Sequence, residues 1–287
     1  MDLIFHFVRS VDIGVYRFFN AYAGNWLLDH IAGFEEDNNL IKGGLFLAAY
    51  IYIWFRKGLE QERNRRTTIA IFTGTMVALA VCRAIADLAP FRVRPMFDPA
   101  IPHPAYAFSV LPNMESWSSF PSDTAAYFFA LAIGLAHLLR RYTAPLMFYT
   151  AVWICVPRMF LGVHYLSDMI AGTFIGTTVV LASIRSEWLR SSVAGRVLGF
   201  MEAKPQLFYP AAFLVCFEMG ALFDDIREAG HGLLHAVSRG FGGEHSIFAL
   251  VAGGMLICAL IAACVAARYL NWFAFARRTA ATRLKGA

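Results

Sequence analysis

Charged side chains are scarce in this 287-residue sequence. Asp, Glu, Lys and Arg make up 16% of it, whereas hydrophobic residues make up 58% and the mean hydropathy is +0.53. Because soluble globular domains contain about 25% charged residues, this composition excludes an ordinary soluble domain. The long apolar runs indicate a polytopic helical membrane protein instead.

Recognisable cofactor motifs are also missing. The five cysteines all lie in apolar runs and lack the spacing of metal ligands, so we expect neither a metal nor a cofactor. The sequence has no dinucleotide fingerprint, phosphate-binding P-loop, internal repeat or low-complexity tract. The N-terminal stretch lacks the small-residue cleavage site of a signal peptide. The chemistry must therefore come from a few polar residues between the apolar runs.

The apolar runs predict an all-α protein with about six to seven transmembrane helices. The runs with little or no charge are 43–55, 67–89, 121–139, 143–156, 169–184, 209–223 and 247–267. Residues 3–23 differ, because Arg9, Asp12 and Arg17 are spaced among aromatic residues as in an amphipathic helix at a membrane interface.

These patterns divide the chain into three parts. We expect residues 1–39 to form an N-terminal interfacial helical segment and residues 40–185 to form the membrane core. Residues 186–287 form a C-terminal extension with about two transmembrane helices and a basic cytoplasmic tail.

Basic residues cluster in every second connection between the predicted spans. The clusters lie within 56–66, 140–141, 185–204 and 277–285. We attribute the net charge of +5 to this topology and predict no nucleic-acid binding. By the positive-inside rule the basic connections are cytoplasmic, so the alternate connections face outward. We therefore expect a multi-pass protein of a bacterial-type inner (plasma) membrane, with its active site facing the periplasm or exterior.

One outward-facing connection contains Arg158, His164 and Asp168 in an apolar setting. On a continuous helix His164 and Asp168 share a face one turn apart, so the carboxylate holds one ring nitrogen and leaves the other free to attack. The planar guanidinium of Arg158 suits a phosphoryl group. These residues indicate phosphate chemistry, and the alternative is an ion pair at a helix end.

The other outward-facing connection contains Arg92, Arg94-Pro95 and, further on, Pro121-Ser122 before an apolar helix. Serines before a proline at the first helical turn provide free amides and a hydroxyl, which bind an anion. Simple helix capping by Ser122 is the alternative. Arg94 likewise suits a phosphate, or extends to the membrane interface without a ligand.

In this order the three segments resemble the type 2 phosphatidic acid phosphatase family, which comprises integral-membrane lipid phosphatases related to vanadium haloperoxidases. The family pattern is Lys, six residues, Arg-Pro; then Pro-Ser-Gly-His; then Ser-Arg, five residues, His, three residues, Asp. The resemblance covers roughly residues 40–185. It implies a helical fold in which His164 attacks phosphorus and Asp168 orients it. The phosphoryl oxygens are then held by backbone amides and by Arg94, Ser122 and Arg158.

The sequence departs from this pattern in the first motif, where Asp87 replaces the family lysine. It also departs in the third motif, where Pro157 replaces the serine. We expect Asp87 to pair with Arg83 one helical turn earlier, and Arg92 to supply the missing positive charge.

In the second motif Asp123 and Thr124 replace glycine and the general-acid histidine. Family members that act on lipid diphosphates can have Asp at the glycine position, so Asp123 and Thr124 stay among the predicted phosphate-binding residues. Thr124 cannot donate the proton that a basic leaving group needs, a contribution of ~10²–10⁴ in rate. A lipid diphosphate leaves as a stable lipid phosphate and needs less help.

We therefore predict a membrane lipid phosphatase that acts through a phosphohistidine on a lipid (di)phosphate, with a polyprenyl diphosphate such as undecaprenyl diphosphate as the leading substrate. The alternatives are a phosphotransferase with a lipid or glycan acceptor, and a catalytically degenerate protein that binds a lipid phosphate. Membrane lipids are the expected partners, and the sequence specifies no protein partner.

Two residues outside the motifs each have two possible roles. His103 is the one replacement for the missing acid that the outer loop offers, or it is an ordinary loop histidine. Glu218, inside an apolar run, is either functional or satisfied by an interhelical hydrogen bond.

Overall fold

The computed structural model describes residues 2–101 and 114–223, and these residues form helices without a strand. The all-α prediction is thus confirmed for the described part. The helices are α1 (Asp2–Asn20), α2 (Trp26–Asp37), α3 (Leu45–Phe55), α4 (Gln61–Leu88), α6 (Asp123–Leu138), α7 (Thr143–Tyr149), α8 (Val156–Phe160), α9 (Leu166–Arg185), α10 (Ala194–Ala203) and α11 (Pro205–Gly220). Short helical turns are η1 (Leu40–Gly44), η2 (Pro95–Phe97), η3 (Arg140–Tyr142), η4 (Thr150–Cys155) and η5 (Trp188–Val193).

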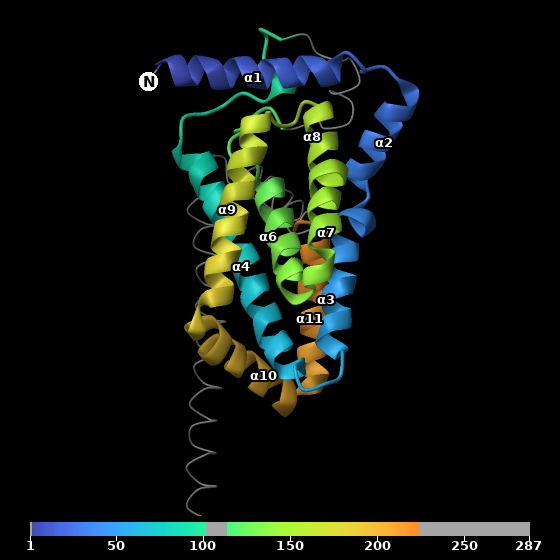
Figure 1. Ribbon diagram of the computed structural model, residues 1–287, viewed down its shortest axis with the longest axis vertical. Helices are drawn as coiled ribbons and strands as arrows, with labels where there is room; N and C mark the ends of the chain where they lie inside the picture. The colour runs from blue at the N-terminus through green and yellow to red at the C-terminus, as the bar shows by residue number, and fades with distance from the viewer. Residues whose placement is uncertain (1, 102–113, 224–287) are drawn as a thin grey trace, which may run out of the picture. The chain divides into compact units, whose positions relative to one another are not determined.

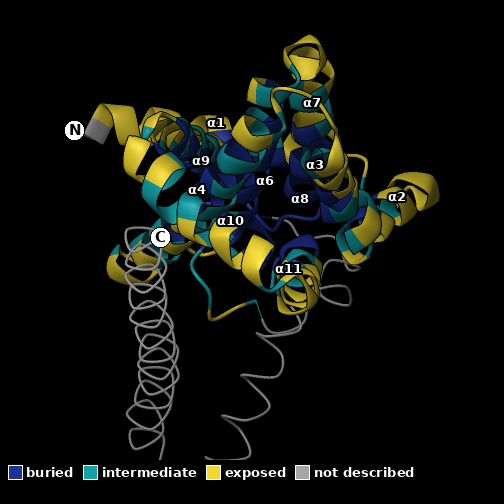
Figure 2. Ribbon diagram, turned by 90° about the horizontal axis from the view of Figure 1, so that it is seen from below, coloured by how far each residue is buried: buried dark blue, intermediate teal, exposed yellow. Residues whose placement is uncertain are grey.

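Helix α6 is the central helix of the bundle. Figure 2 shows it almost entirely buried, with the exposed faces on the surrounding helices. Its sequence is apolar on every side and rich in alanine, which suits a helix that packs in all directions. It packs most extensively on α9 and α4. Its buried position brings its N-terminus, at Ser122, into the interior of the bundle.

Glycines on α9 make the contact with α6 unusually close. A methyl group at Gly172 would lie 2.1 Å from the carbonyl oxygen of Ser122, and one at Gly176 would lie 2.0 Å from that of Ala126. Only a residue without a side chain permits this approach of two backbones. The crossing therefore fixes the start of α6 against the first turns of α9.

Only α4 and α9 among the described helices are long and apolar enough to cross a membrane. Helices also occupy the other predicted runs up to residue 223, but they are shorter, and some runs are divided between two helices. The predicted number of six to seven transmembrane helices is therefore not confirmed. The last predicted span, 247–267, lies outside the described residues.

Helix α1 lies across the end of the bundle where α8 and α9 meet, at a large angle to both (Figure 1). The helix is amphipathic as predicted, because Leu3, Phe5 and Phe7 are exposed whereas Asp12 and Tyr16 are buried. The buried face of α1 thus contains a carboxylate, which the prediction of an amphipathic interfacial helix did not anticipate.

The connection from α8 to α9 is a turn and not a continuous helix. Gly162 adopts a left-handed conformation with φ of 72°, which favours glycine. Its carbonyl oxygen accepts a hydrogen bond of 2.9 Å from the amide of Met96. The turn therefore joins the segment after Arg94 to the segment that contains His164.

Candidate active site

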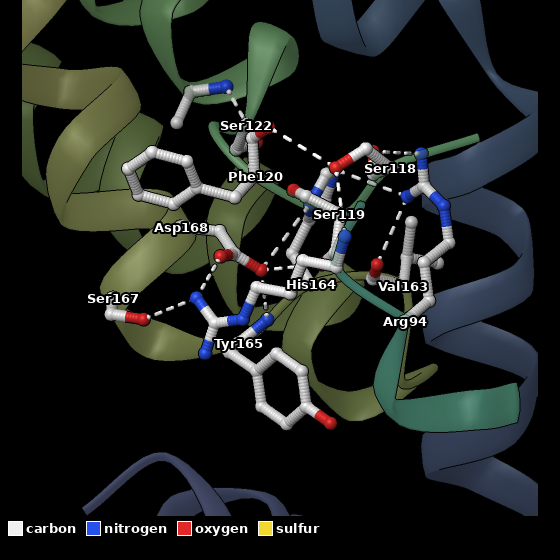
Figure 3. Close-up of polar contacts among 12 residues, drawn as sticks. Arg94, Ser118, Ser119, Phe120, Ser122, Val163, His164, Tyr165, Ser167 and Asp168 are labelled. Carbon is white, nitrogen blue, oxygen red and sulfur yellow. Dashed lines mark hydrogen bonds and ion pairs between the residues drawn. The ribbon is translucent and has the colours of Figure 1, made fainter. Parts of the chain in front are cut away.

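His164 lies in this turn with a side chain that is 2% exposed. Its Nδ1 atom lies 2.8 Å from the carbonyl oxygen of Ser119 (Figure 3). Because a carbonyl oxygen only accepts hydrogen bonds, Nδ1 must carry the proton. The lone pair is then on Nε2, which is the atom able to attack phosphorus.

Asp168 contacts the imidazole less directly than predicted. Its Oδ2 atom lies 3.9 Å from Nδ1 of His164, which is within ion-pair range of a protonated ring but too long for a hydrogen bond. The same oxygen accepts hydrogen bonds from Ser119 Oγ at 2.5 Å and from the Tyr165 amide at 2.8 Å. Asp168 thus orients His164 through Ser119, which holds the ring with its carbonyl oxygen.

The predicted shared helical face was wrong because the helix is interrupted. Tyr165 is the N-cap of α9, so His164 precedes the helix and Asp168 is in its first turn. Ser119, part of the serine pair before Pro121, contacts both residues. Nothing in the sequence indicated that the Ser119 carbonyl oxygen bonds to His164, since every residue has a backbone carbonyl group.

Arg94 lies on the other side of the imidazole. Its Nη1 atom is 3.4 Å from Nε2 of His164 and donates a hydrogen bond of 3.0 Å to the carbonyl oxygen of Val163 (Figure 3). Burial is the main cause that lowers the pKa of Arg94 to about 10, so the side chain remains charged at neutral pH. The structure thus places a cation beside Nε2 of His164, and phosphate binding by Arg94 stays a prediction.

The environment also keeps His164 neutral. Burial is the largest cause that lowers the pKa of its imidazole well below the usual value, and the charges of Arg94 and Arg158 lower it further. A neutral imidazole has the free lone pair that nucleophilic attack needs.

Arg158 is buried in an ion pair that the sequence analysis missed. Its Nη1 atom lies 2.9 Å and 2.6 Å from the two carboxylate oxygens of Glu36 on α2. Lys42 approaches from the same side and donates to the backbone carbonyl oxygen of Glu36. The acidic run at 35–37 was visible in the sequence, but nothing in its spacing indicated a contact with α8.

Glu35, next to Glu36, is fully buried. Neither of its carboxylate oxygens has a hydrogen-bond partner among the described residues. Burial is the main cause that raises its pKa to about 8, although Lys42 and Arg158 oppose the shift. Glu35 is therefore mostly a neutral acid at neutral pH.

Ser122 is the N-cap of α6, and its Oγ accepts a hydrogen bond of 3.3 Å from the Ala125 amide. This is the capping role that the sequence analysis left as the alternative. Thr124, the residue at the family histidine position, is buried, and its Oγ1 lies 3.4 Å from Asp123 Oδ1. Neither hydroxyl contacts His164, although both residues belong to the same end of α6.

Asp123 pairs with Arg83 on α4, with 2.5 Å between Oδ2 and Nη2. The predicted pair of Arg83 with Asp87 is therefore wrong. The carboxylate of Asp123 interacts electrostatically with Arg94, Arg158 and His164. Arg83 thus brings a further cation to the site. The sequence had suggested Asp87 as its partner, because residues four apart on one helix commonly pair.

Arg92 does not face the same space as Arg94. One nitrogen of its guanidinium pairs with Asp168 and the other lies 2.6 Å from Asp12 Oδ2. Its guanidinium also lies 4.4 Å from the centre of the Tyr165 ring. Arg92 therefore holds carboxylates, and the expectation that it supplies the missing phosphate-binding charge is not supported.

The remaining predictions lie away from this cluster. Glu218 is on α11, which packs on η1 and α10, so the structure does not bring it to His164. His103 lies outside the described residues. Within 2–101 and 114–223, no group of His, Cys, Asp and Glu could hold a metal ion.

A comparison with protein families identifies this region. Residues 67–192 match the family model of the PAP2 superfamily. No curated protein and no solved structure matches the chain. The matched region runs from α4 to η5 and includes Arg94, Ser122, Arg158, His164 and Asp168. Members of the superfamily are generally phosphatases. The match confirms the resemblance found in the sequence: residues 67–192, less than half of the chain, are similar to the PAP2 superfamily.

Proposed function

We propose that the protein transfers a phosphoryl group from a membrane lipid (di)phosphate through a phosphohistidine at His164. The observation that supports this most directly is the hydrogen bond from Nδ1 to the Ser119 carbonyl oxygen, which leaves Nε2 unprotonated beside Arg94. In the first step Nε2 forms a bond to phosphorus while the bond from phosphorus to the leaving oxygen breaks. In the second step an oxygen nucleophile takes the phosphoryl group and the phosphorus–nitrogen bond breaks.

Buried cations would stabilise the charge that develops on the phosphoryl oxygens. Arg94 lies beside the nucleophile, and Arg158 and Arg83 act on the same region through Asp123. The imidazole gains a positive charge when Nε2 is phosphorylated. The Ser119 carbonyl oxygen and the Asp168 carboxylate at 3.9 Å stabilise that charge.

Arg158 can offer Nη1 to the substrate only if that atom leaves Glu36, whereas its Nε has no hydrogen-bond partner among the described residues. A phosphoryl group offers the same planar pair of oxygens as a carboxylate, so it suits the guanidinium equally well. We infer that the substrate displaces Glu36 from Arg158 in the productive complex. Glu36 thereby holds the arginine in place while the site is empty.

The residue at position 124 favours a diphosphate as the substrate. Thr124 provides no proton for an alkoxide, and its hydroxyl approaches only Asp123 among the described side chains. A lipid phosphate leaves readily without that proton, whereas a lipid alkoxide does not. A polyprenyl diphosphate, which presents a lipid phosphate as leaving group, is accordingly our proposed substrate.

The proposed location is the outer face of a membrane. The basic connection 56–60 and the segment 185–204 lie at one end of the bundle, and the turn with His164 lies at the other (Figure 1). If the basic end is cytoplasmic, the site faces the exterior and α1 lies at the outer interface. A cysteine at Ser116, which is exposed near the site, should then react with an impermeant thiol reagent in intact cells, whereas a cysteine at the fully exposed Leu59 should not. The reverse pattern would overturn the orientation.

A phosphotransferase is the second candidate, because no general base for water stands beside His164 among the described residues. Arg94, Arg158 and Asp123 act on the imidazole electrostatically and Asp168 lies 3.9 Å from it, and both carboxylates are engaged by arginines. An acceptor alcohol that is positioned by its own binding energy would resolve the phosphohistidine without that base.

Phosphate release by the purified protein tests the proposal. The assay compares undecaprenyl diphosphate with phosphatidic acid, each with and without a lipid alcohol acceptor. We expect faster release from the diphosphate. Equal or faster release from phosphatidic acid would overturn the substrate class, and turnover only with the acceptor would establish the transferase. Binding of both lipids without turnover would establish a degenerate member.

A further inference from the structure

We propose that Asp12, on the N-terminal helix, is a positioning residue for the phosphoryl-transfer site. It lies outside the region that matches the family, yet it is 2% exposed and contacts the first turn of α9. This inference rests on the proposed function and adds a part of the chain that neither the motifs nor the family match includes.

The carboxylate of Asp12 is fully engaged by two residues. Its Oδ1 accepts a hydrogen bond of 2.9 Å from the Ser167 amide, and its Oδ2 accepts one of 2.6 Å from the Ser167 hydroxyl. The Ser167 amide is one of the free amides at the start of α9, so Asp12 caps this helix from a different helix. Asp12 thereby fixes the residue directly before Asp168.

The second partner of Asp12 connects it to Asp168 itself. Arg92 lies 2.6 Å from Asp12 Oδ2 through Nη2, and its Nη1 pairs with Asp168 and donates to the Ser167 hydroxyl at 2.8 Å. The carboxylates of Asp12 and Asp168 thus share the guanidinium of Arg92, and each holds one of its two terminal nitrogens. Without Asp12 one end of the fork would be unpaired, and the partly exposed guanidinium would be free to turn toward solvent.

Hydrogen bonds through Ser119 also connect Asp168 to the proposed nucleophile, His164. Asp168 accepts from the Ser119 hydroxyl, and the Ser119 carbonyl oxygen accepts from Nδ1 of His164. A shift of Asp168 therefore moves the group that sets the imidazole orientation. Arg94 and Arg158 contact none of the atoms of Asp12, so loss of Asp12 should weaken the chemical step and leave phosphate binding intact.

Steady-state kinetics of Asp12→Asn in the full-length protein test this role. We expect kcat for lipid diphosphate to fall on the order of tenfold, as is typical when a group that orients a functional side chain is lost. KM should change less than about twofold. A second variant, Ile13→Ala, is the matched control, because Ile13 packs α1 on the apolar cluster around Tyr16 and Tyr165 without contacting a carboxylate. An equal loss of kcat in Ile13→Ala would mean that Asp12 only anchors α1.

A double-mutant cycle tests the connection through Arg92. If Asp12 acts through the guanidinium, Asp12→Asn should cause little further loss of kcat in an Arg92→Gln background. Independent, multiplicative losses would overturn the action of Asp12 through Arg92, and an effect confined to KM would overturn the positioning role.

Hydrogen exchange separates this proposal from the proposed function. The segment 161–168 should exchange faster in Asp12→Asn than in the natural protein and in Ile13→Ala. If the natural protein turns over no lipid (di)phosphate, the proposed function fails, while faster exchange still supports the positioning role. Unchanged exchange in Asp12→Asn would overturn that role whatever the activity.

Discussion

Arg158 and Glu36, which are 122 residues apart in the sequence, form a buried ion pair in which one guanidinium nitrogen reaches both carboxylate oxygens. The arginine belongs to the third family motif, whereas the glutamate lies outside the family match. For Nη1 of Arg158 the proposed substrate would have to compete with this carboxylate. Glu36 is therefore expected to influence both stability and phosphate affinity.

We expect Glu36→Gln to destabilise the empty protein and to increase its response to phosphate. Removal of one partner from a buried pair leaves an uncompensated charge and costs ~3–5 kcal/mol. An anion that replaces the carboxylate stabilises the folded state by mass action. In thermal unfolding, inorganic phosphate should raise the Tm of Glu36→Gln more than that of the natural protein.

The matched control for this experiment is Glu62→Gln, which removes an exposed carboxylate from its pair with Arg66. Exposed pairs contribute about 0–1 kcal/mol, so this change should leave both Tm and the phosphate response unchanged. A phosphate response of Glu36→Gln no larger than that of the control would contradict competition at Arg158.

His164→Ala should abolish the covalent intermediate. With labelled lipid diphosphate, the natural protein should acquire acid-labile, base-stable label, and the variant should acquire none, because Nε2 is removed. His30→Ala is the control, since His30 is exposed on α2 and bonds only to the local carbonyl oxygen of Trp26. Label on the His164 variant would rule out this nucleophile.

The pH profile should show an acid limb that lies below the ordinary histidine range. Burial and the charges of Arg94 and Arg158 lower the pKa of His164, so the imidazole stays neutral and nucleophilic as the pH falls through about 6.5. Protonation of the imidazole itself should thus cause no loss of activity between about pH 7 and about pH 6. In Arg94→Gln the limb should move to higher pH, and a limb that stays in place would show that Arg94 does not act on the ring.

Glu35→Gln should stabilise the protein increasingly as the pH rises. Burial raises the folded-state pKa of Glu35 to about 8, above its usual value of 4.5, so ionisation opposes folding between those values. The neutral amide removes this cost. The Tm difference between variant and natural protein should be small near pH 5, grow as the pH rises, and level off above about pH 8. A difference that is constant with pH would mean that Glu35 does not titrate in this range.

Gly172→Ala should destabilise the contact between α6 and α9. The added methyl group would meet the Ser122 carbonyl oxygen at 2.1 Å, and such overpacking costs ~1–3 kcal/mol or more. Gly33→Ala is the control, because Gly33 lies within helix α2 with no atom within 4 Å of the added group. There alanine should be neutral or stabilising by ~0.5–1 kcal/mol. Urea unfolding of both variants would measure the difference, and equal effects would contradict the closeness of the crossing.

The sequence was sufficient to identify the residues of the motifs but not their partners. Arg94, Arg158, His164 and Asp168 were selected from residue type and spacing, and the structure brings them together around the start of α6. Local spacing also predicted the amphipathic character of α1, because the period of a helix is visible in any single segment.

The incorrect predictions concern contacts between distant segments. The direct hydrogen bond from Asp168 to His164 assumed a continuous helix, and the left-handed turn at Gly162 interrupts it. Arg83 was assigned to Asp87 because both lie on one helix, whereas its partner Asp123 begins another. Such pairings depend on how helices cross, and a short range of sequence does not contain that information.

The close crossing at Gly172 and Gly176 has a consequence for how a lipid approaches. Two backbones that leave no space for a methyl group also leave none for a hydrocarbon chain. A tail of the proposed lipid substrate therefore cannot slide between α6 and α9. Such a tail must lie elsewhere, and its headgroup must reach His164 by a route that does not cross this contact.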